Sequence, residues 1–337
     1  MKNVKIELKN IGIRPIEELS VQEKTNIAEK VATKLARLNV DGVTHNQILE
    51  RLFDASMYTA EINNNLGKVS YFYKNKTIYF DKNINLVNLD ESILRECIYY
   101  LQHQRERKGL CKFEEYKVKG RALNEAGINY ILNRVFNKNE NNKAFVLLNQ
   151  MLLITGKEVF LDSILNNNNR FEEKFIEQTN SEVLYYKMQS TFDAMFDLEQ
   201  IINRLNNEGR KSKNPQRYLS KINMHKQTLN YKFSEIQWEI YNRYFSRKIE
   251  LIEQLEEIKK CQNEIFEFNK WLEISSDESK YTNFAKEKIG KLNKKEQDIL
   301  KRKPNNSMTL FRGNIIHKII NTLRKIVLKS KEYEIEE

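Results

Sequence analysis

The sequence is poor in the residues that interrupt helices: its 337 residues include 10 glycines and 3 prolines. Because glycine and proline most often end or kink helices, this scarcity predicts a mostly helical chain. The three cysteines are odd in number and lack CxxC spacing, which predicts free thiols in a reducing compartment. No apolar run approaches the ~18 residues of a spanning helix, and no secretory signal is visible. We therefore expect a cytoplasmic protein.

Taken as a whole, the sequence mixes basic and acidic residues. The 57 basic and 46 acidic residues give a net charge of +11, and both signs are interspersed through most of the chain. Such a surface is soluble and favours acidic partners through its long-range field. A nucleic-acid signature would need the charge gathered on one face or one helix, so we predict no specific nucleic-acid partner.

Hydrophobic spacing predicts the elements before residue 90. Alternation over 2–8 predicts a short strand, and residues 57–66 are interpreted as a connector. Steps of three and four predict a helix over 21–39, and Thr44 can cap the helix that follows it. The aromatic, β-branched stretch 69–80 predicts a β-hairpin.

Helical patterns dominate the rest of the chain. The acidic start at Asp90 predicts a helix over 91–106, and further helices are expected over 113–134 and 143–154. Beyond residue 171 the pattern is interrupted at 209–215, which predicts a long helical hairpin with coiled-coil character. We therefore expect a predominantly α protein of the α+β class, divided into domains at 1–205 and 216–337. The second domain ends in a basic amphipathic helix over 313–331.

Two of these predicted helices carry the most informative pattern. Residues 93–102 read I-L-R-E-C-I-Y-Y-L-Q, and residues 120–126 read G-R-A-L-N-E-A. The first segment resembles the metal helix of the gluzincin zinc peptidases, whose motif is H-E-x-x-H followed by a downstream glutamate ligand. The second resembles the N-E-A segment that carries this glutamate in small bacterial members. The resemblance covers roughly residues 60–200 and implies a zincin-like fold.

The chemistry of that family needs two histidines that this chain does not have. Two histidines at i and i+4 share a helix face and bind one zinc ion, and the glutamate between them is the general base. By the resemblance, Glu96 matches the base and Glu125 the third ligand, but Arg95 and Tyr99 stand at the histidine positions. Because arginine stays protonated and has no free lone pair, we predict that the zinc site is lost and that no cofactor is bound.

The remaining histidines do not replace the missing ligands. The chain has four of them, namely His45, His103, His225 and His317. Only His103 is near in sequence, and two turns along the helix it is poorly placed to share a metal with Glu96. Each is interpreted as a surface or packing residue.

We therefore predict a catalytically inactive, metallopeptidase-like protein that binds a protein or peptide partner. Arg95 would place its guanidinium where the metal charge would sit, paired with Glu125 or Glu96, because a buried carboxylate needs such a partner. Tyr99 and Asn124 would complete a vestigial metal-site cleft.

Three alternatives remain open. The chain could be a zinc metallopeptidase with unusual ligands, or a coiled-coil or membrane-surface adaptor that makes peripheral contact through 313–331. Residues 91–134 could also be an ordinary amphipathic helical hairpin without any relation to peptidases.

Overall fold

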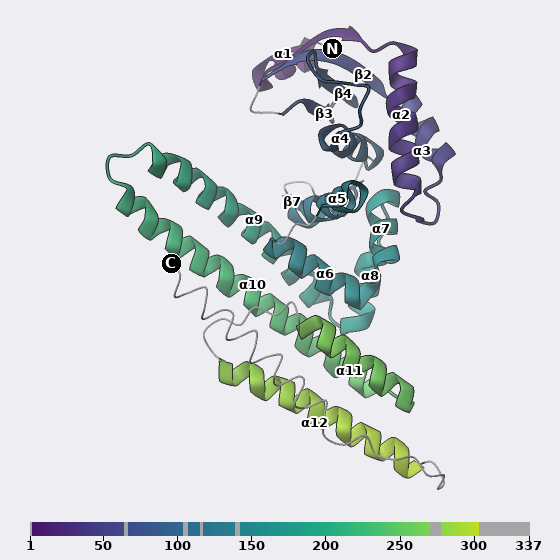
Figure 1. The fold of residues 1–337 in the computed structure, drawn as a ribbon, viewed down its shortest axis with the longest axis vertical. Coiled ribbons are helices and arrows are strands. Elements are labelled where there is room, and N and C mark those ends of the chain that lie inside the picture. Colours follow the sequence, from purple (N-terminus) through teal and green to yellow (C-terminus); the bar gives the residue numbers. More distant parts are fainter. Residues whose placement is uncertain are drawn as a thin grey trace. The chain divides into compact units, whose positions relative to one another are not determined.

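The computed structural model describes residues 2–63, 67–103, 107–114, 117–138, 142–269 and 278–302. Within them the chain is mostly helical with a small mixed sheet, as the scarcity of glycine and proline predicts (Figure 1). The predicted helix over 313–331 lies outside the described residues. No single described helix is long and apolar enough to cross a membrane. Helices α6 (Lys143–Thr155) and α7 (Lys157–Asn166), which form a bent pair, together have the length and composition of a membrane span.

The chain divides into two compact units. The first contains residues 1–141 and 157–171, and the second contains residues 142–156 and everything from 172 onward. This division differs from the predicted boundary near residues 205–216. The physical reason is that helix α9 (Glu182–Arg210) packs along α10 (Pro215–Leu251), so the two helices of the hairpin bury their apolar faces against each other.

The first unit is built on a four-stranded sheet of order β1-β2-β4-β3, in which only the β2–β4 pair is parallel. A second sheet has three antiparallel strands in the order β5-β6-β7. The strands are β1 Ile13–Glu18, β2 Ser56–Ile62, β3 Val69–Phe72, β4 Thr77–Asp81, β5 Arg107–Lys108, β6 Cys111–Glu114 and β7 Lys117–Lys119. The helices are α1 Lys2–Ile11, α2 Val21–Ala36, α3 His45–Phe53, α4 Glu91–Leu101, α5 Arg121–Phe136 and α7.

Local capping chemistry explains where several helices begin. Ser20 and Glu23 form a capping box before α2, and Thr44 with Gln47 forms another before α3, so the predicted cap at Thr44 is confirmed. The Asp90 carboxylate accepts the Ile93 N–H at 2.9 Å and starts α4, as predicted. The predicted hairpin is also confirmed, as strands β3 and β4.

Two predictions near the N-terminus are wrong. Residues 2–8 lie in α1 instead of a strand: Val4 and Leu8 are one helical turn apart and pack on the core, while Ile6 is 58% exposed. Residues 57–66 were expected to form a connector, yet β2 begins at Ser56. This strand lies between β1 and β4, so partners distant in sequence stabilise it.

The two helices of the motif are shorter than predicted. Helix α4 ends at Leu101, and α5 begins only at Arg121. Strands β6 and β7 occupy the start of the segment that was expected to be helical. Gly120, with φ 75°, makes the left-handed turn from β7 into α5, a conformation that glycine adopts without strain.

The second unit is a set of helices around the α9–α10 hairpin. Its helices are α6, α8 (Arg170–Thr179, which begins in the first unit), α9, α10, α11 Leu255–Asn269 and α12 Glu278–Arg302. Lys187 on α9 pairs with Glu239 on α10 at 2.5 Å, and aromatic rings such as Tyr241 and Phe245 are fully buried. The predicted interruption between residues 209 and 215 is confirmed, because α9 ends and α10 begins there.

Candidate functional site

Helix α4 is the centre of the candidate site. Its apolar residues, Ile93, Leu94, Cys97, Ile98 and Leu101, are buried. The half-buried residues Arg95, Glu96 and Tyr99 lie on its remaining surface. Because α4 packs against both β3 and α5, these three side chains can reach either neighbour.

Arg95 and Tyr99 both bind the carboxylate of Glu125. The Arg95 Nη1 atom lies 3.4 Å from one carboxylate oxygen, and the Tyr99 hydroxyl donates to the other. Arg95 also donates from Nη2 to the Asn129 Oδ1 atom at 2.6 Å. Of the two partners expected for Arg95, Glu125 and Glu96, the structure shows Glu125, and positions i and i+4 of α4 converge on one carboxylate of α5. We call Arg95, Tyr99, Glu125 and Asn129 the arginine cluster.

The surroundings of Tyr99 keep its phenol neutral. Burial raises the pKa of Tyr99 well above its ordinary value, and the negative charge of Glu125 raises it further. The charge of Glu96 acts in the same direction, while that of Arg95 opposes it. A phenol that stays protonated donates a hydrogen bond to Glu125 near neutral pH, and it is a poor metal ligand.

Glu96 turns toward the sheet instead of the arginine cluster. Its carboxylate accepts the backbone N–H of Tyr71 on β3 at 2.7 Å. β3 is the outermost strand of its sheet, and the Lys68 carbonyl accepts the Asp81 N–H at 2.8 Å. By the alternation of antiparallel pairing, the N–H groups of Val69 and Tyr71 therefore point away from β4. Glu96 thus occupies one outward donor of the edge strand.

The structure does not bring Asn124 into the cluster. Adjacent residues of a helix point about 100° apart, and the Asn124 amide is buried on another side of α5. It accepts the Leu110 N–H at 2.9 Å and exchanges hydrogen bonds with Gln102. Gln102 in turn donates to the Ile164 carbonyl at 3.0 Å. The predicted binding role of Asn124 is thereby replaced by a structural one that ties α4, α5 and α7 together.

Cys97 and His103, the cysteine and the histidine nearest to the cluster in sequence, do not form a nucleophile–base pair. Cys97 is fully buried, and that burial raises the pKa of its thiol. The His103 ring instead lies edge-on against Tyr71, with centroids 5.8 Å apart. These positions do not form the thiol–imidazole contact that nucleophilic catalysis needs.

The donor set of the cluster does not fit a zinc ion. Zinc is held in proteins by thiolate, imidazole and carboxylate groups, and only Glu125 of the arginine cluster belongs to these. Its two carboxylate oxygens already accept from a cation and a phenol. Among the described residues, no three His, Cys, Asp or Glu side chains gather as a metal site would require.

Two partners in the site were not predicted. Asn129 follows Glu125 by one helical turn, so its place on the same face of α5 could have been found from spacing. The bond from the Tyr71 N–H to Glu96 could not have been found from spacing, because this bond depends on how β3 packs against α4.

Comparisons with protein-family models, with curated proteins and with solved structures gave no match to this chain.

Proposed function

We propose that the first unit is a metallopeptidase-like domain without catalytic activity, which binds an extended segment of a protein partner. The arginine cluster is the observation that carries this proposal. At both positions where the resemblance expects a zinc ligand, the side chain instead satisfies Glu125: Arg95 supplies a positive charge and Tyr99 a hydrogen-bond donor.

The cluster is a substitute for a metal in electrostatic terms only. A guanidinium neutralises a half-buried carboxylate as a cation would, but it cannot polarise a water molecule as a Lewis acid does. The side chains of Arg95 and Glu125 are 31% and 26% exposed, so the cluster lies at the surface, where a partner can reach it.

The outer edge of β3 is the surface that suits an extended segment. A peptide can add a strand to the outermost strand of a sheet through backbone hydrogen bonds. Val69 offers an outward N–H there, next to the Tyr71 N–H that Glu96 occupies. Glu96 would then set the register, because an added strand has to form its bonds beside that occupied donor.

Metal analysis and cleavage assays separate this proposal from the zinc-peptidase alternative. The full chain, purified in the presence of zinc, is expected to hold no stoichiometric metal and to leave casein and unstructured peptides intact. Stoichiometric zinc together with chelator-sensitive cleavage would show that the protein is an enzyme with unusual ligands.

A proline at Val69 tests the binding surface. Peptides selected from a displayed random library on the full chain should bind about tenfold more weakly to Val69→Pro, because proline removes the outward N–H. Proline is tolerated at the first residue of a strand. Val69→Ala is the matched control: it also truncates the buried side chain but keeps the N–H, and it should retain binding. This part of the proposal would be contradicted if the two variants bound the peptides equally weakly, or if the library yielded no peptide that binds.

A further inference from the structure

The loop end of the α9–α10 hairpin is basic without any acidic residue. Residues 209–234, which we call the basic end, contain Arg210, Lys211, Lys213, Arg217, Lys221, Lys226 and Lys232, and no Asp or Glu. Seven basic and no acidic residues give +7, out of a net charge of +11 for the whole chain. This one segment therefore concentrates basic charge in a way that the sequence as a whole does not.

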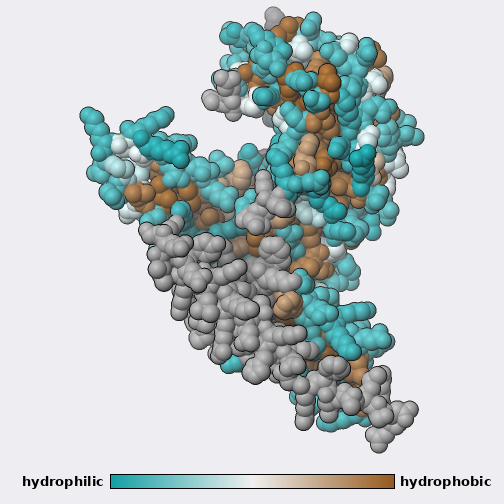
Figure 2. Space-filling view, viewed as in Figure 1, coloured by the Kyte–Doolittle hydropathy of each residue, from teal (hydrophilic) through white to brown (hydrophobic). Residues whose placement is uncertain are grey.

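All seven basic side chains of this end are exposed, and none forms an ion pair with any other part of the chain that the structure describes. The opposite part of the hairpin differs, because Lys187 there is paired with Glu235 and Glu239. In the space-filling view the surface at the loop end is mostly hydrophilic, with hydrophobic residues beside it (Figure 2). Its cations are thus available to an external anion.

The placement of these cations does not serve the stability of the hairpin. Arg217 and Lys221 are four residues apart on α10, where like charges repel. Lys213 and Arg217 also flank the start of α10, the positive end of its dipole. Asn214 occupies the cap position but makes no side-chain capping bond. An anion bound here would relieve both effects.

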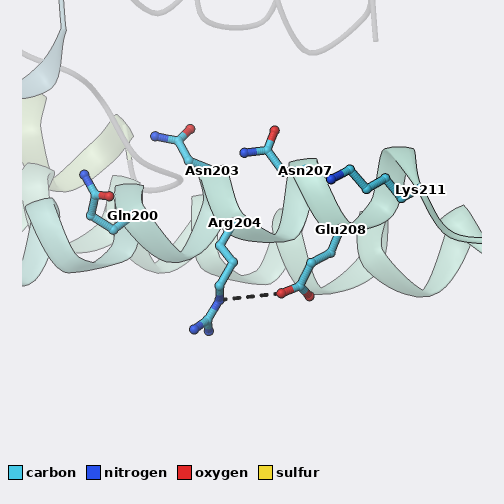
Figure 3. Close-up of a pocket in the computed structure, with 6 residues that line it drawn as sticks. All are labelled: Gln200, Asn203, Arg204, Asn207, Glu208 and Lys211. Carbon is cyan, nitrogen blue, oxygen red and sulfur yellow. Dashed lines mark ion pairs between the residues drawn. The ribbon is translucent and has the colours of Figure 1, made fainter. Parts of the chain in front are cut away.

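Helix α9 adds a row of amides beside the cations. Asn203, Asn207 and Lys211 follow one another at intervals of four, and in the close-up they point to the same side of the helix (Figure 3). Arg204 and Glu208, 4.0 Å apart, lie on another side. This row, together with Gln200, Arg204 and Glu208, lines a shallow hollow of about 350 Å³. Amide side chains donate to phosphate and sugar oxygens, so the row suits a polar polymer.

Helix α10 interleaves cations with exposed apolar side chains. Steps of three and four place Arg217, Lys221, Met224 and Tyr231 on one stripe, where Met224 is 55% and Tyr231 63% exposed. An exposed tyrosine among cations offers a ring on which a base can stack. From Arg217 to Lys232 the helix rises about 22 Å, roughly two-thirds of the ~34 Å turn of a DNA duplex.

A membrane surface fits this end less well than a nucleic acid does. A helix that lies in a membrane needs a continuous apolar face opposite its charges. The inward apolar residues Ile222, Leu229 and Phe233 of α10 are buried, and the outward stripe mixes charge with apolar groups. An extended row of cations instead matches a polymer with regularly spaced phosphates.

We propose that the basic end of the α9–α10 hairpin binds the phosphate backbone of nucleic acid without sequence preference. The contact is made by lysine and arginine side chains to phosphates, by the α9 amides to backbone oxygens, and by Tyr231 to an exposed base. This inference rests on the second unit alone, and it stands or falls independently of the function proposed for the first unit.

Fluorescence anisotropy with the full chain tests the proposal. The probes are a labelled ~20-base-pair DNA duplex, the same length of duplex RNA, and a single strand of each. If four cations contact duplex phosphates, raising the salt from about 50 to about 200 mM weakens binding about 150-fold, from a slope near −0.9 per contact. DNA and RNA share this chemistry, and the four probes show which of the two is preferred.

Matched charge variants locate the contact. The test variant replaces Lys213, Arg217, Lys221 and Lys226 with Gln. The control replaces Lys260, Lys286, Lys294 and Lys301, four exposed lysines on α11 and α12, in the same way. The two variants lose the same charge from the same unit, and far-ultraviolet circular dichroism verifies that both stay helical. The test variant should bind every probe at least about tenfold more weakly and lose most of the salt dependence, while the control keeps both.

Three outcomes would overturn the proposal. The first is that none of the probes binds at low salt. The second is equal weakening by both variants, which would assign binding to the overall charge of the chain. The third is binding to phosphatidylserine vesicles that the test substitutions abolish while nucleic acid does not bind, which would assign the basic end to a membrane.

Discussion

Replacing Tyr99 with phenylalanine removes one hydroxyl and keeps the ring that α4 packs against its neighbours. The hydroxyl donates to Glu125, and a hydrogen bond to a charged group contributes about 1.5–3 kcal/mol to stability. The Glu125 side chain is 26% exposed, so water regains part of the loss and we expect a cost of about 1–2 kcal/mol. In a double-mutant cycle with Glu125→Gln, a coupling energy of about 1 kcal/mol is expected.

Amide hydrogen exchange in peptides from α4 and α5 is the suitable assay. Of the two tryptophans, Trp238 belongs to the second unit and Trp271 lies outside the described residues, so tryptophan fluorescence is not a measure of the first unit. A loss of about 1–2 kcal/mol speeds exchange through unfolding of the first unit by about 5- to 30-fold. Tyr73→Phe, at a tyrosine that is 57% exposed, is the matched control and should stay within about 0.5 kcal/mol of wild type.

The result that refutes this reasoning is an effect of Tyr99→Phe no larger than that of the control. It would mean that the phenol does not hold Glu125 in solution. A coupling energy near zero in the cycle would lead to the same conclusion, because it would show that Tyr99 and Glu125 stabilise the fold independently.

Two further predictions concern the first unit. Gly109→Ala should lower its stability by about 2 kcal/mol, because Gly109 has φ 59° and an added Cβ would lie 2.2 Å from the Asn124 amide oxygen. Thermal unfolding measures this loss of stability. Gly67→Ala is the milder control, because Gly67 has φ 82° but lies in open space. Equal losses of stability in the two variants would contradict the packing argument. Raising the pH above about 10 should destabilise the unit, because burial raises the pKa of Tyr71 and Tyr99. The stability that the two neutral phenols contribute is fully present at a pH below the ordinary tyrosine pKa. It is lost as the pH rises toward the pKa values of these tyrosines in the folded protein. Tyrosinate absorbance from these two residues should therefore appear together with unfolding. Ionisation of both tyrosines while the unit stays folded would contradict the burial of their hydroxyl groups.

The sequence predicts those elements whose signals are local. The Thr44 cap, the start of α4 at Asp90 and the β3–β4 hairpin depend on neighbouring residues, and all three are found in the structure. β2 and the β6–β7 pair were missed because strands depend on partners far away in the chain. The spacing of Val4 and Leu8 fits one face of a helix as well as it fits a strand, which explains the error at α1.

The candidate site was predictable where spacing along a helix decides the contact. Positions i and i+4 placed Arg95 and Tyr99 on one face, and Glu125 was one of the two partners expected for Arg95. The bond from Tyr99 to Glu125 was not predicted. The bond from the Tyr71 N–H to Glu96, and the amide pair of Asn124 and Gln102, depend on how elements pack. The pattern of apolar residues within each helix does not contain that information.

The central claim is that Arg95 and Tyr99 stand where zinc ligands would stand. The most direct measurement is the zinc affinity of the double variant Arg95→His with Tyr99→His, by competition with a chelating dye. Both native side chains reach the same carboxylate, so two histidines and Glu125 should supply the three ligands of an open zinc site. We predict one zinc ion per chain in this variant, none in wild type, and loss of the ion when Glu125→Gln is added. A double variant that folds but binds no zinc would contradict the claim.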